Sequence, residues 1–404
     1  MNSPALRPGG FGLTALLAFL TSFGPLSVDL FLPSMPAIGR AFNAPESQVQ
    51  LTISLYLVGY AIGQIFYGPL SDRFGRRPVV LTAFAIFCLG SLGAALAQDL
   101  EWLVLGRIGQ ALGASGAMIV TRAVVRDFYE GAHAGRQLSI MGMMMGLVPI
   151  VAPIIGGLLL VSAGWRAGFA FHFAVGALAL LLVWRYLAET HRPSSTSIAA
   201  VAASYRAVVA HPVFLANMIV GCFAYSGLFA WIAGSPFVLQ GLIGLTPLQF
   251  SLCYAVSCAG FMTGGAIATR LVLQFGLDRT AGLGVLALAL AGTAAAVSVA
   301  VGVALPITLT ASMALFLCGM GMALPQVTAG ALTPFPHHAG TASSLVGFAQ
   351  QCSGAIMGIA VGNTLGASAW PMVTGVALAG IASLVLWAVT RTLRTRPTKP
   401  TATA

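Results

Sequence analysis

The sequence has few charged residues. Asp, Glu, Lys and Arg make up 7% of its 404 residues, against roughly 25% in an ordinary soluble domain. Hydrophobic residues make up 58%. This balance excludes a soluble globular protein and is typical of a chain that lies mostly within a membrane.

Several chemical signatures are also missing. The six cysteines lie in apolar segments and form no CxxC pair, so we expect buried free thiols rather than disulfides or a metal site. There is no G-x-x-x-x-G-K-[ST] loop for nucleotide phosphates and no soluble segment large enough for an ATP-binding domain. A membrane enzyme would need polar groups clustered at one membrane face, and no nucleophile, base or metal set of that kind is visible.

What the chain does have is a series of apolar runs, each close to the ~20 residues that a helix needs to cross a membrane. They predict twelve spans, at residues 12–36, 50–69, 78–97, 102–122, 137–162, 167–187, 213–239, 249–271, 280–303, 305–330, 340–364 and 369–390. The longest polar connection falls at the middle of the chain. We therefore expect an all-α membrane protein with two six-helix halves, residues 1–187 and 213–404, joined by a linker at 188–212; the second half ends in a short basic tail.

The basic residues predict the orientation. A net charge of +10 would suggest nucleic acid in a soluble protein, but most of the 19 basic residues lie in short loops between apolar runs, so we expect no nucleic-acid partner. With the amino end in the cytoplasm, sixteen of the 19 fall on the cytoplasmic side, Arg40 and Arg166 fall outside, and Arg107 lies within a span. This asymmetry predicts that both termini are cytoplasmic.

The densest charge cluster is the stretch Gly68-Pro69-Leu70-Ser71-Asp72-Arg73-Phe74-Gly75-Arg76-Arg77, between two apolar runs. We expect a short cytoplasmic loop between the second and third helices. A weaker copy, Phe275-Gly276, follows 201 residues after Phe74-Gly75, with leucines at two of the charged positions. Two related halves would suit a transporter that rocks about a midplane site, and the weak second copy predicts that any role of this loop is one-sided.

Asp29 is the only acidic residue inside an apolar span, and Arg107 is the only basic residue deep in one. An unpaired carboxylate in hydrocarbon is costly, so Asp29 is a candidate for a functional residue. The proton affinity of a carboxyl depends on burial and on nearby cations. Both residues fall in the outer half of the bilayer at ~1.5 Å rise per residue, so pairing between them is geometrically reasonable. The alternatives are structural: Asp29 could cap a helix interrupted before Pro33, and Arg107 could join helices one and four.

These stretches resemble the motifs of the major facilitator superfamily. Residues 68–77 match its signature loop at every defining position. The segment Leu105 to Gly113, with Arg107 and Gln110, resembles the fourth-helix motif of its drug:proton antiporters, and residues 152–157 resemble their fifth-helix motif, with alanine at the first position. Residues 29–36 and 340–345 narrow the resemblance to the Bcr/CflA type, the bicyclomycin and chloramphenicol exporters.

The resemblance implies a twelve-helix transporter in a bacterial inner membrane. It would export small amphipathic drugs in exchange for protons, with the proton gradient as energy source and no cofactor, and membrane lipid around it. Nothing in the sequence demands a protein partner, so we expect a monomer. An exporter of an endogenous metabolite, such as a sugar or purine, would share every motif. A proton symporter for uptake is disfavoured by the helix-five motif.

The resemblance also implies roles for the charged residues. Arg107 would take part in proton transfer with Asp29. Asp72 and Arg76 would form a charge relay with Asp127, and Asp72 would face the start of helix eleven near Gly340, so that the loop acts as a latch that holds the inside closed. The latch residues would be Gly68, Asp72, Arg73, Gly75, Arg76, Arg77 and Asp127. The alternative is a solvated loop whose charges only fix the topology.

Two further groups of candidates carry less information. The helix-five residues suit a hinge between states as well as ordinary tight packing; they are Pro149, Pro153, Gly156 and Gly157. The candidate substrate-binding residues are aromatic, flexible or polar, although each alone would more often face lipid or the packed core. They are Tyr56, Tyr60, Met144, Met145, Tyr225, Phe229, Phe348 and Gln351.

Overall fold

The computed structural model describes residues 10–129, 131–190, 198–335, 339–366 and 368–394. All the regular elements in these residues are helical, and none is a strand. The predicted all-α fold is therefore confirmed. The polar stretch 192–197 of the expected linker lies outside the described residues.

The contacts divide the chain into two compact units. The first unit comprises Met1–Thr196 and Gly244–Ala255, and the second comprises Ser197–Ile243 and Val256–Ala404. The sequence had placed residues 244–255 in the second half, because they follow the linker and the seventh span. In the structure they pack within the first unit, a difference that matters for the site below.

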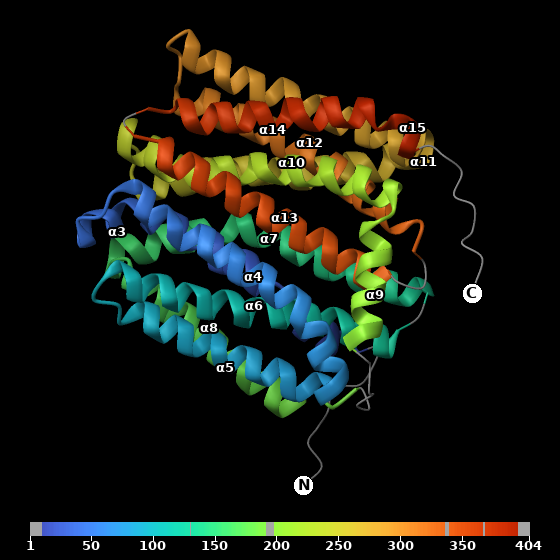
Figure 1. Cartoon of the computed structure of the whole chain (residues 1–404). Coiled ribbons are helices and arrows are strands. Elements are labelled where there is room, and N and C mark those ends of the chain that lie inside the picture. The colour runs from blue at the N-terminus through green and yellow to red at the C-terminus, as the bar shows by residue number, and fades with distance from the viewer. Residues whose placement is uncertain (1–9, 130, 191–197, 336–338, 367, 395–404) are drawn as a thin grey trace. The chain divides into compact units, whose positions relative to one another are not determined.

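The helices of the first unit that precede the linker form two sets along the chain. A broken first span contains α1 (Phe11–Thr21), α2 (Phe23–Asp29), the 3₁₀ turn η1 (Leu32–Ser34) and α3 (Met35–Phe42). The long helices are α4 (Glu46–Phe74), α5 (Arg76–Ala95), α6 (Leu100–Phe128), α7 (Gly131–Ala163) and α8 (Arg166–Tyr186). The helices α4 and α6 pack side by side, as do α5 and α8 (Figure 1).

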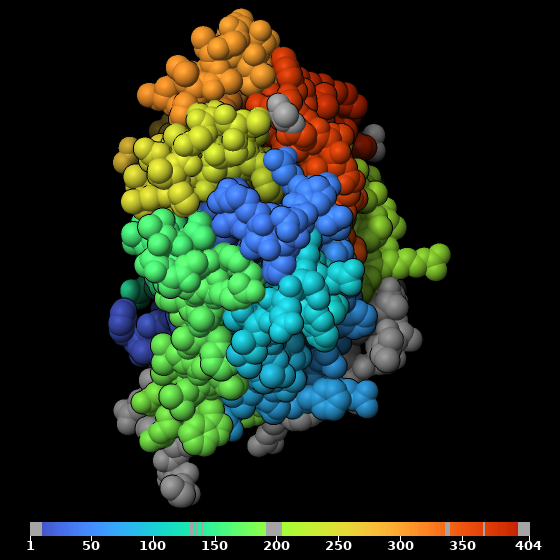
Figure 2. Space-filling model, turned by 90° about the vertical axis from the view of Figure 1, so that its left-hand side faces the viewer, coloured from blue at the N-terminus to red at the C-terminus, as the bar shows by residue number. Residues whose placement is uncertain are grey.

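Close packing around α6 depends on glycine. A Cβ at Gly106 would lie 2.7 Å from the backbone nitrogen of Ala94, and a Cβ at Gly113 would lie 2.5 Å from the carbonyl oxygen of Ala83. Small residues allow helix backbones to approach in this way inside a membrane. Figure 2 looks onto the end of the first unit where α3, the α5–α6 connection and the α7–α8 turn gather.

The second unit begins with α9 (Ile198–Val209), which lies within the predicted linker. It continues with α10 (Pro212–Ser235), the π-helix η2 (Pro236–Leu242), most of α11 (Pro247–Ala300), α12 (Pro306–Leu332), α13 (Ala339–Thr364), α14 (Trp370–Val389) and α15 (Arg391–Arg394). Val208 of α9 packs with Phe214, Ala342 and Val346. The linker helix is thus anchored on the second unit.

The number of spans agrees with the prediction. Among the described residues ten helices are long and apolar enough to cross a membrane, and the first span, bent by 41°, makes an eleventh. The helix α11 has 54 residues and turns at Gly276, where φ is +77°. At ~1.5 Å per residue it is more than twice the ~30 Å thickness of a hydrocarbon core. It therefore holds two spans, which makes twelve.

Candidate functional site

Asp29 is the last residue of α2, at the point where the first span changes geometry. Pro33 has no N–H to donate to the carbonyl of Asp29 four residues earlier, and the chain tightens into the 3₁₀ turn Leu32–Ser34. The side chain of Asp29 is nevertheless buried, with 4% exposed. A break in the helix thus places a carboxyl group inside the first unit rather than at a helix end in solvent.

The carboxyl of Asp29 is held by a residue far away in sequence. The hydroxyl of Tyr254 donates a hydrogen bond to its Oδ1 across 2.9 Å, and Tyr254 is itself buried. Tyr254 belongs to the segment of α11 that packs in the first unit. The sequence analysis missed this residue, because a tyrosine inside an apolar span carries no signal of its own.

Arg107 is completely buried in α6, close to the backbone before Asp29. Its Nη1 donates to the carbonyl oxygen of Ser27 at 2.8 Å and to Oε1 of Gln110 at 2.9 Å. The guanidinium carbon lies 4.7 Å from the ring centroid of Phe31 and 4.3 Å from that of Tyr56. These hydrogen bonds and cation–π contacts compensate part of the cost of burying the charge.

The two charged residues therefore share one buried cluster without a direct bond. Among the ion pairs of the described residues, none joins Asp29 to Arg107. Arg107 instead reaches the α2 backbone two residues before Asp29. Its Nε and Nη2 are buried without a hydrogen-bond partner in the structure. The roles of both residues therefore stay predictions.

Other polar side chains surround the same cluster. Tyr56 donates to the carbonyl oxygen of Gly24 at 3.3 Å, and its ring stacks with that of Tyr60 at 6.1 Å between centroids. His172 of α8 lies 3.3 Å from the carbonyl oxygen of Leu26 and is almost fully buried. Two of the predicted substrate-binding residues, Tyr56 and Tyr60, thus lie beside the charged cluster.

The predicted helix-five residues lie mostly at close contacts. A Cβ at Gly156 would collide with the carbonyl of Leu30, so α7 approaches the backbone directly after Asp29. A Cβ at Gly157 would lie 2.7 Å from Oγ of Ser251, which donates to the carbonyl oxygen of Pro153 at 2.7 Å. This half of the motif therefore serves tight packing.

The remaining candidates in α7 lie before those contacts. Pro149 and Met145 are half-buried, and Met144 is exposed. None of the three has a polar contact that would define a binding site, so their predicted roles stay predictions.

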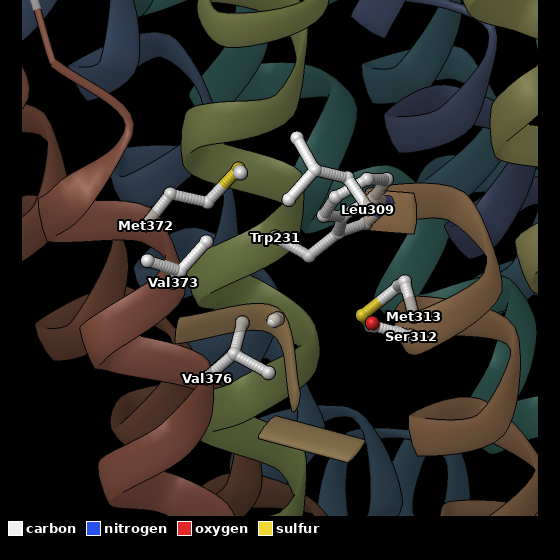
Figure 3. Close-up of a pocket in the computed structure, with 8 residues that line it drawn as sticks. Trp231, Leu309, Ser312, Met313, Met372, Val373 and Val376 are labelled. Atoms are coloured by element: carbon white, nitrogen blue, oxygen red, sulfur yellow. The ribbon is translucent and has the colours of Figure 1, made fainter. Parts of the chain in front are cut away.

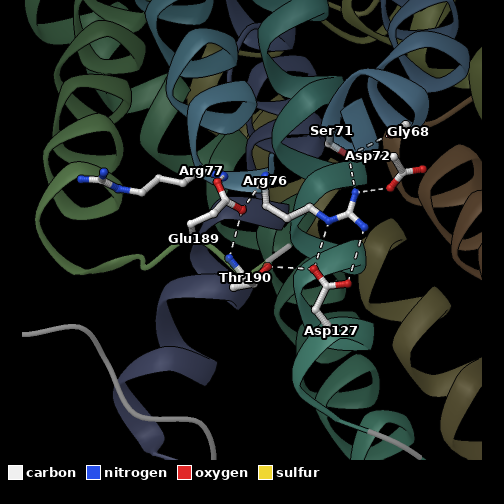
Figure 4. Close-up of polar contacts among 8 residues, drawn as sticks. All are labelled: Gly68, Ser71, Asp72, Arg76, Arg77, Asp127, Glu189 and Thr190. Carbon is white, nitrogen blue, oxygen red and sulfur yellow. Dashed lines mark hydrogen bonds and ion pairs between the residues drawn. The ribbon is translucent and has the colours of Figure 1, made fainter. Parts of the chain in front are cut away.

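The second group of site residues lies where α4 meets α5. Of residues 68–77, which were predicted to form a loop, only Gly75 lies between the two helices. Asp72 is in the last turn of α4, Arg76 begins α5, and Asp127 is near the end of α6 (Figure 4). The buried guanidinium of Arg76 donates to Asp72 through Nη1, to Asp127 Oδ2 through Nε at 3.0 Å, and to Oγ of Ser71 at 2.7 Å. The structure thus brings together the three residues of the charge relay.

The other loop residues have different surroundings. Gly75 has a φ of +94°, a conformation that L side chains rarely adopt. Gly68 accepts a hydrogen bond from Ser71 through its carbonyl, and a Cβ there would meet nothing within 4 Å. Arg73 is exposed beside the ring of Phe74. Arg77 donates to the carbonyl oxygen of Trp184 at 2.6 Å.

Two residues that follow α8 complete this network, and the sequence analysis missed both. Glu189 accepts hydrogen bonds from the backbone N–H of Arg76 at 2.8 Å and of Arg77 at 3.1 Å. Thr190 donates to Oδ2 of Asp127 at 2.8 Å. Glu189 thereby caps the first turn of α5, where backbone N–H groups have no partner within the helix. Its rarity was a usable signal, since the chain has only 9 acidic residues.

The remaining candidates belong to the second unit. Tyr225 of α10 donates to Oε1 of Gln351 of α13 at 2.7 Å, and the ring of Phe229 lies 5.1 Å from that of Tyr225. Phe229 and Gln351 are buried, and Phe348 is half-buried. Three of these four predicted residues therefore form one cluster within the unit.

A cavity elsewhere in the second unit is too small for a drug. Its volume is about 10 Å³, roughly the minimum for one water molecule. Figure 3 shows it between α10, α12 and α14, and none of the predicted substrate-binding residues lines it. The lining residues are Trp231, Ala295, Leu309, Ser312, Met313, Met372, Val373 and Val376.

Comparisons with known proteins define the class. Residues 17–359 match the model of the Major Facilitator Superfamily, so the chain belongs to this superfamily of multi-pass membrane transporters. It is 31% identical over 358 residues to "Uncharacterized MFS-type transporter YdgK" of Bacillus subtilis, covering 87% of this chain and 88% of the relative. It is 28% identical over 351 residues to "Multidrug resistance protein D" of Escherichia coli, with coverages of 87% and 88%.

Solved structures support the same fold. The D-xylose-proton symporter matches with a TM-score of 0.73 at 15% identity, over 97% of this chain and 98% of that one. A POT family transporter in complex with 5-aminolevulinic acid matches with a TM-score of 0.77 at 15% identity, over 97% and 99%. At such low identity the likeness extends to the fold and not to the substrate.

Proposed function

We propose that this protein exports small amphipathic compounds, of the bicyclomycin or chloramphenicol type, across a bacterial inner membrane in exchange for protons. Both termini would lie in the cytoplasm, the protein would act as a monomer, and the proton gradient would be the only energy source. The observation that carries the proposal is the buried Asp29, with 4% of its surface exposed; the fully buried Arg107 is bonded to the backbone of Ser27, two residues before it.

A buried carboxyl in the same unit as a buried cation is suited to proton exchange. Burial favours the protonated form of a carboxyl, and a cation favours the ionised form, so a modest rearrangement can change which form is stable. In the proposed cycle, drug enters from the cytoplasm while Asp29 loses its proton. Opening to the outside then releases the drug, and Asp29 takes up a proton again from that side.

The network around Arg76 would act as the latch of this cycle. Arg76 joins the ends of α4, α5 and α6 at one end of the first unit, and the basic residues of the loop favour a cytoplasmic position for that end. A carboxylate near the amino end of a helix stabilises the arrangement by ~0.3–1 kcal/mol through the helix dipole. Charges arranged in this way would stabilise one conformational state at the cytoplasmic side.

The choice of drugs rests on two supports. Relatives of similar length are named multidrug resistance proteins, including MdtL of Escherichia coli O157:H7 at 29% identity over 363 residues. The motifs at residues 29–36 and 340–345 resemble the Bcr/CflA type.

The test compares the wild type with Asp29→Asn in proteoliposomes with an imposed pH gradient. We expect the wild type to accumulate chloramphenicol against its concentration gradient and to move protons in the opposite direction. The variant should lose both activities, because an amide cannot carry a proton across. Asp99→Asn is the matched control, since Asp99 caps α6 in a connection between helices and Asn caps equally well.

Two outcomes would contradict the proposal. If Asp29→Asn still accumulates drug with undiminished proton movement, Asp29 is not the coupling site. If wild-type vesicles exchange protons for a sugar or purine and not for drugs, the protein is an exporter of an endogenous metabolite.

A further inference from the structure

The segment Gly244–Ala255 follows the seventh span but packs in the first unit. Two hydrogen bonds attach it there. Ser251 donates to the carbonyl oxygen of Pro153 in α7 at 2.7 Å, and Tyr254 donates to Oδ1 of Asp29 at 2.9 Å. Residues three apart lie on one face of a helix, so a single face of α11 carries both contacts.

The contact of Tyr254 differs from that of Ser251 because its acceptor can change charge. A hydrogen bond to an ionised carboxylate is roughly twice as strong as one to a neutral group. Tyr254 is 1% exposed, so water does not compete for its hydroxyl. The attachment of the segment to α2 therefore depends on the protonation of Asp29, whereas the attachment to α7 does not.

The other titratable groups around Asp29 have different acceptors. Tyr56 of α4 donates to the carbonyl of Gly24, Arg107 of α6 donates to that of Ser27, and His172 of α8 lies at that of Leu26. The helix α7 approaches through Gly156, which has no side chain. These groups contact backbone carbonyls of the first span, whereas Tyr254 makes a hydrogen bond to the carboxyl itself.

We infer that Tyr254 is a positioning residue that fastens the segment 244–255 to the first unit when Asp29 is ionised and releases it when Asp29 is protonated. This inference rests on the proposed proton exchange. It explains how the transporter would prevent protons from crossing without drug. An ionised carrier without drug would be held with its outer end closed. A protonated carrier, or one whose drug displaces Tyr254 from Asp29, would be free to change state.

The consequence is a specific defect in Tyr254→Phe. Without the hydroxyl, the ionised and empty carrier could return to the outward state, take up another proton and release it inside. We expect proteoliposomes with this variant to show a drug-independent proton leak on the order of tenfold above the wild type. Drug export would continue, with fewer drug molecules moved per proton. Tyr186→Phe, the same change at the last residue of α8, should behave as the wild type.

A second measurement does not depend on transport. Hydrogen–deuterium exchange of residues 247–255, corrected for the intrinsic effect of pH, reports how often the segment leaves the first unit. In the wild type we expect exchange to slow as pH rises and Asp29 ionises. In Tyr254→Phe it should be fast and independent of pH, and in Ser251→Ala it should be faster but still depend on pH.

The inference is overturned if Tyr254→Phe has the pH-dependent exchange and the proton leak of the wild type. This failure is distinct from failure of the proposed function. If the proposed function is wrong, Asp29→Asn retains proton-coupled drug accumulation, whatever the rate of hydrogen–deuterium exchange in residues 247–255.

Discussion

In the first unit, the loop that ends at Gly75 is followed by a buried arginine, Arg76, which pairs with two acids. In the second unit, the corresponding loop turns at Gly276, and the pair there joins Asp278 to Arg394 at 3.0 Å. In each unit, the chain that follows the last long helix before it, α8 in the first and α14 in the second, contacts the loop of the same unit. In the first unit it contributes Glu189, an acid, and in the second it contributes a base.

This comparison changes the interpretation of the weak repeat. The leucines of the second copy suggested that the loop has a role in one half only, but Asp278, at the position that corresponds to Arg77, finds its partner in α15. Arg394 also donates to the carbonyl oxygen of Trp387 at 2.6 Å, as Arg77 does to that of Trp184. The two units thus share a means of closing the loop, and they differ in the number and sign of the charges.

The largest expected difference concerns the two arginines. Arg76→Ala leaves Asp72 and Asp127 facing each other without a cation, and breaking a buried ion pair costs about 3 kcal/mol or more. Asp72 is 39% exposed and can turn to water, but Asp127 is only 16% exposed and would lose its cation while largely buried. Arg394→Ala leaves only Asp278, whose side chain is 34% exposed and can turn to water, so we expect about 1 kcal/mol. Thermal unfolding in detergent measures both.

Arg76→Lys is the control for charge alone. An ammonium group is a point charge and cannot bind two acids through separate nitrogens as a guanidinium does, so we expect an intermediate loss. Equal destabilisation by Arg76→Ala and Arg394→Ala would mean that the two loops are energetically equivalent and that the charge count does not distinguish them.

The next difference concerns the two glycines. Both have positive φ and an extended ψ, a region that is essentially restricted to glycine, and alanine there costs ~1–3 kcal/mol. A Cβ at Gly75 would also lie 2.6 Å from Oε2 of Glu189, whereas a Cβ at Gly276 meets nothing within 4 Å. We expect Gly75→Ala to destabilise more than Gly276→Ala, by about 1 kcal/mol for the lost cap.

A double variant identifies the source of that difference. If the extra effect arises from Glu189, then Gly75→Ala in a Glu189→Ala background should cost no more than Gly276→Ala. A persistent excess would assign the effect to the backbone of the loop itself.

The sequence predicted the features that follow from composition and regular spacing. Apolar length determines the twelve spans, and the bounds differ by a few residues. The differences are largest where α4 and α6 extend to Phe74 and Phe128, where α7 begins at Gly131 and where the first span continues to Phe42. The relay of Asp72, Arg76 and Asp127 was accessible because charges are rare in this chain and lie in a known motif. Rarity makes a charged residue conspicuous even without a structure.

The missed features are contacts made by ordinary residues. Tyr254 holds Asp29, and a tyrosine in an apolar helix has the same appearance whether it packs, faces lipid or donates a hydrogen bond. The expected pairing of Asp29 with Arg107 depended on side-chain direction, which helix position alone cannot determine. Arg107 turns instead to the carbonyl of Ser27 and to the rings beside it.

The smallest expected effect tests whether the charge of Glu189 matters or only its hydrogen bonds. Glu189→Gln keeps one acceptor for the N–H groups of Arg76 and Arg77 but removes the negative charge from the amino end of α5. A charge at that position contributes ~0.3–1 kcal/mol at an exposed site, and salt screens it. Glu101→Gln, an acid in the first turn of α6, is the matched control. If the loss from Glu189→Gln persists unchanged at high salt, the hydrogen-bond geometry rather than the charge closes the first loop, and the sign reversal between the two units has no energetic consequence.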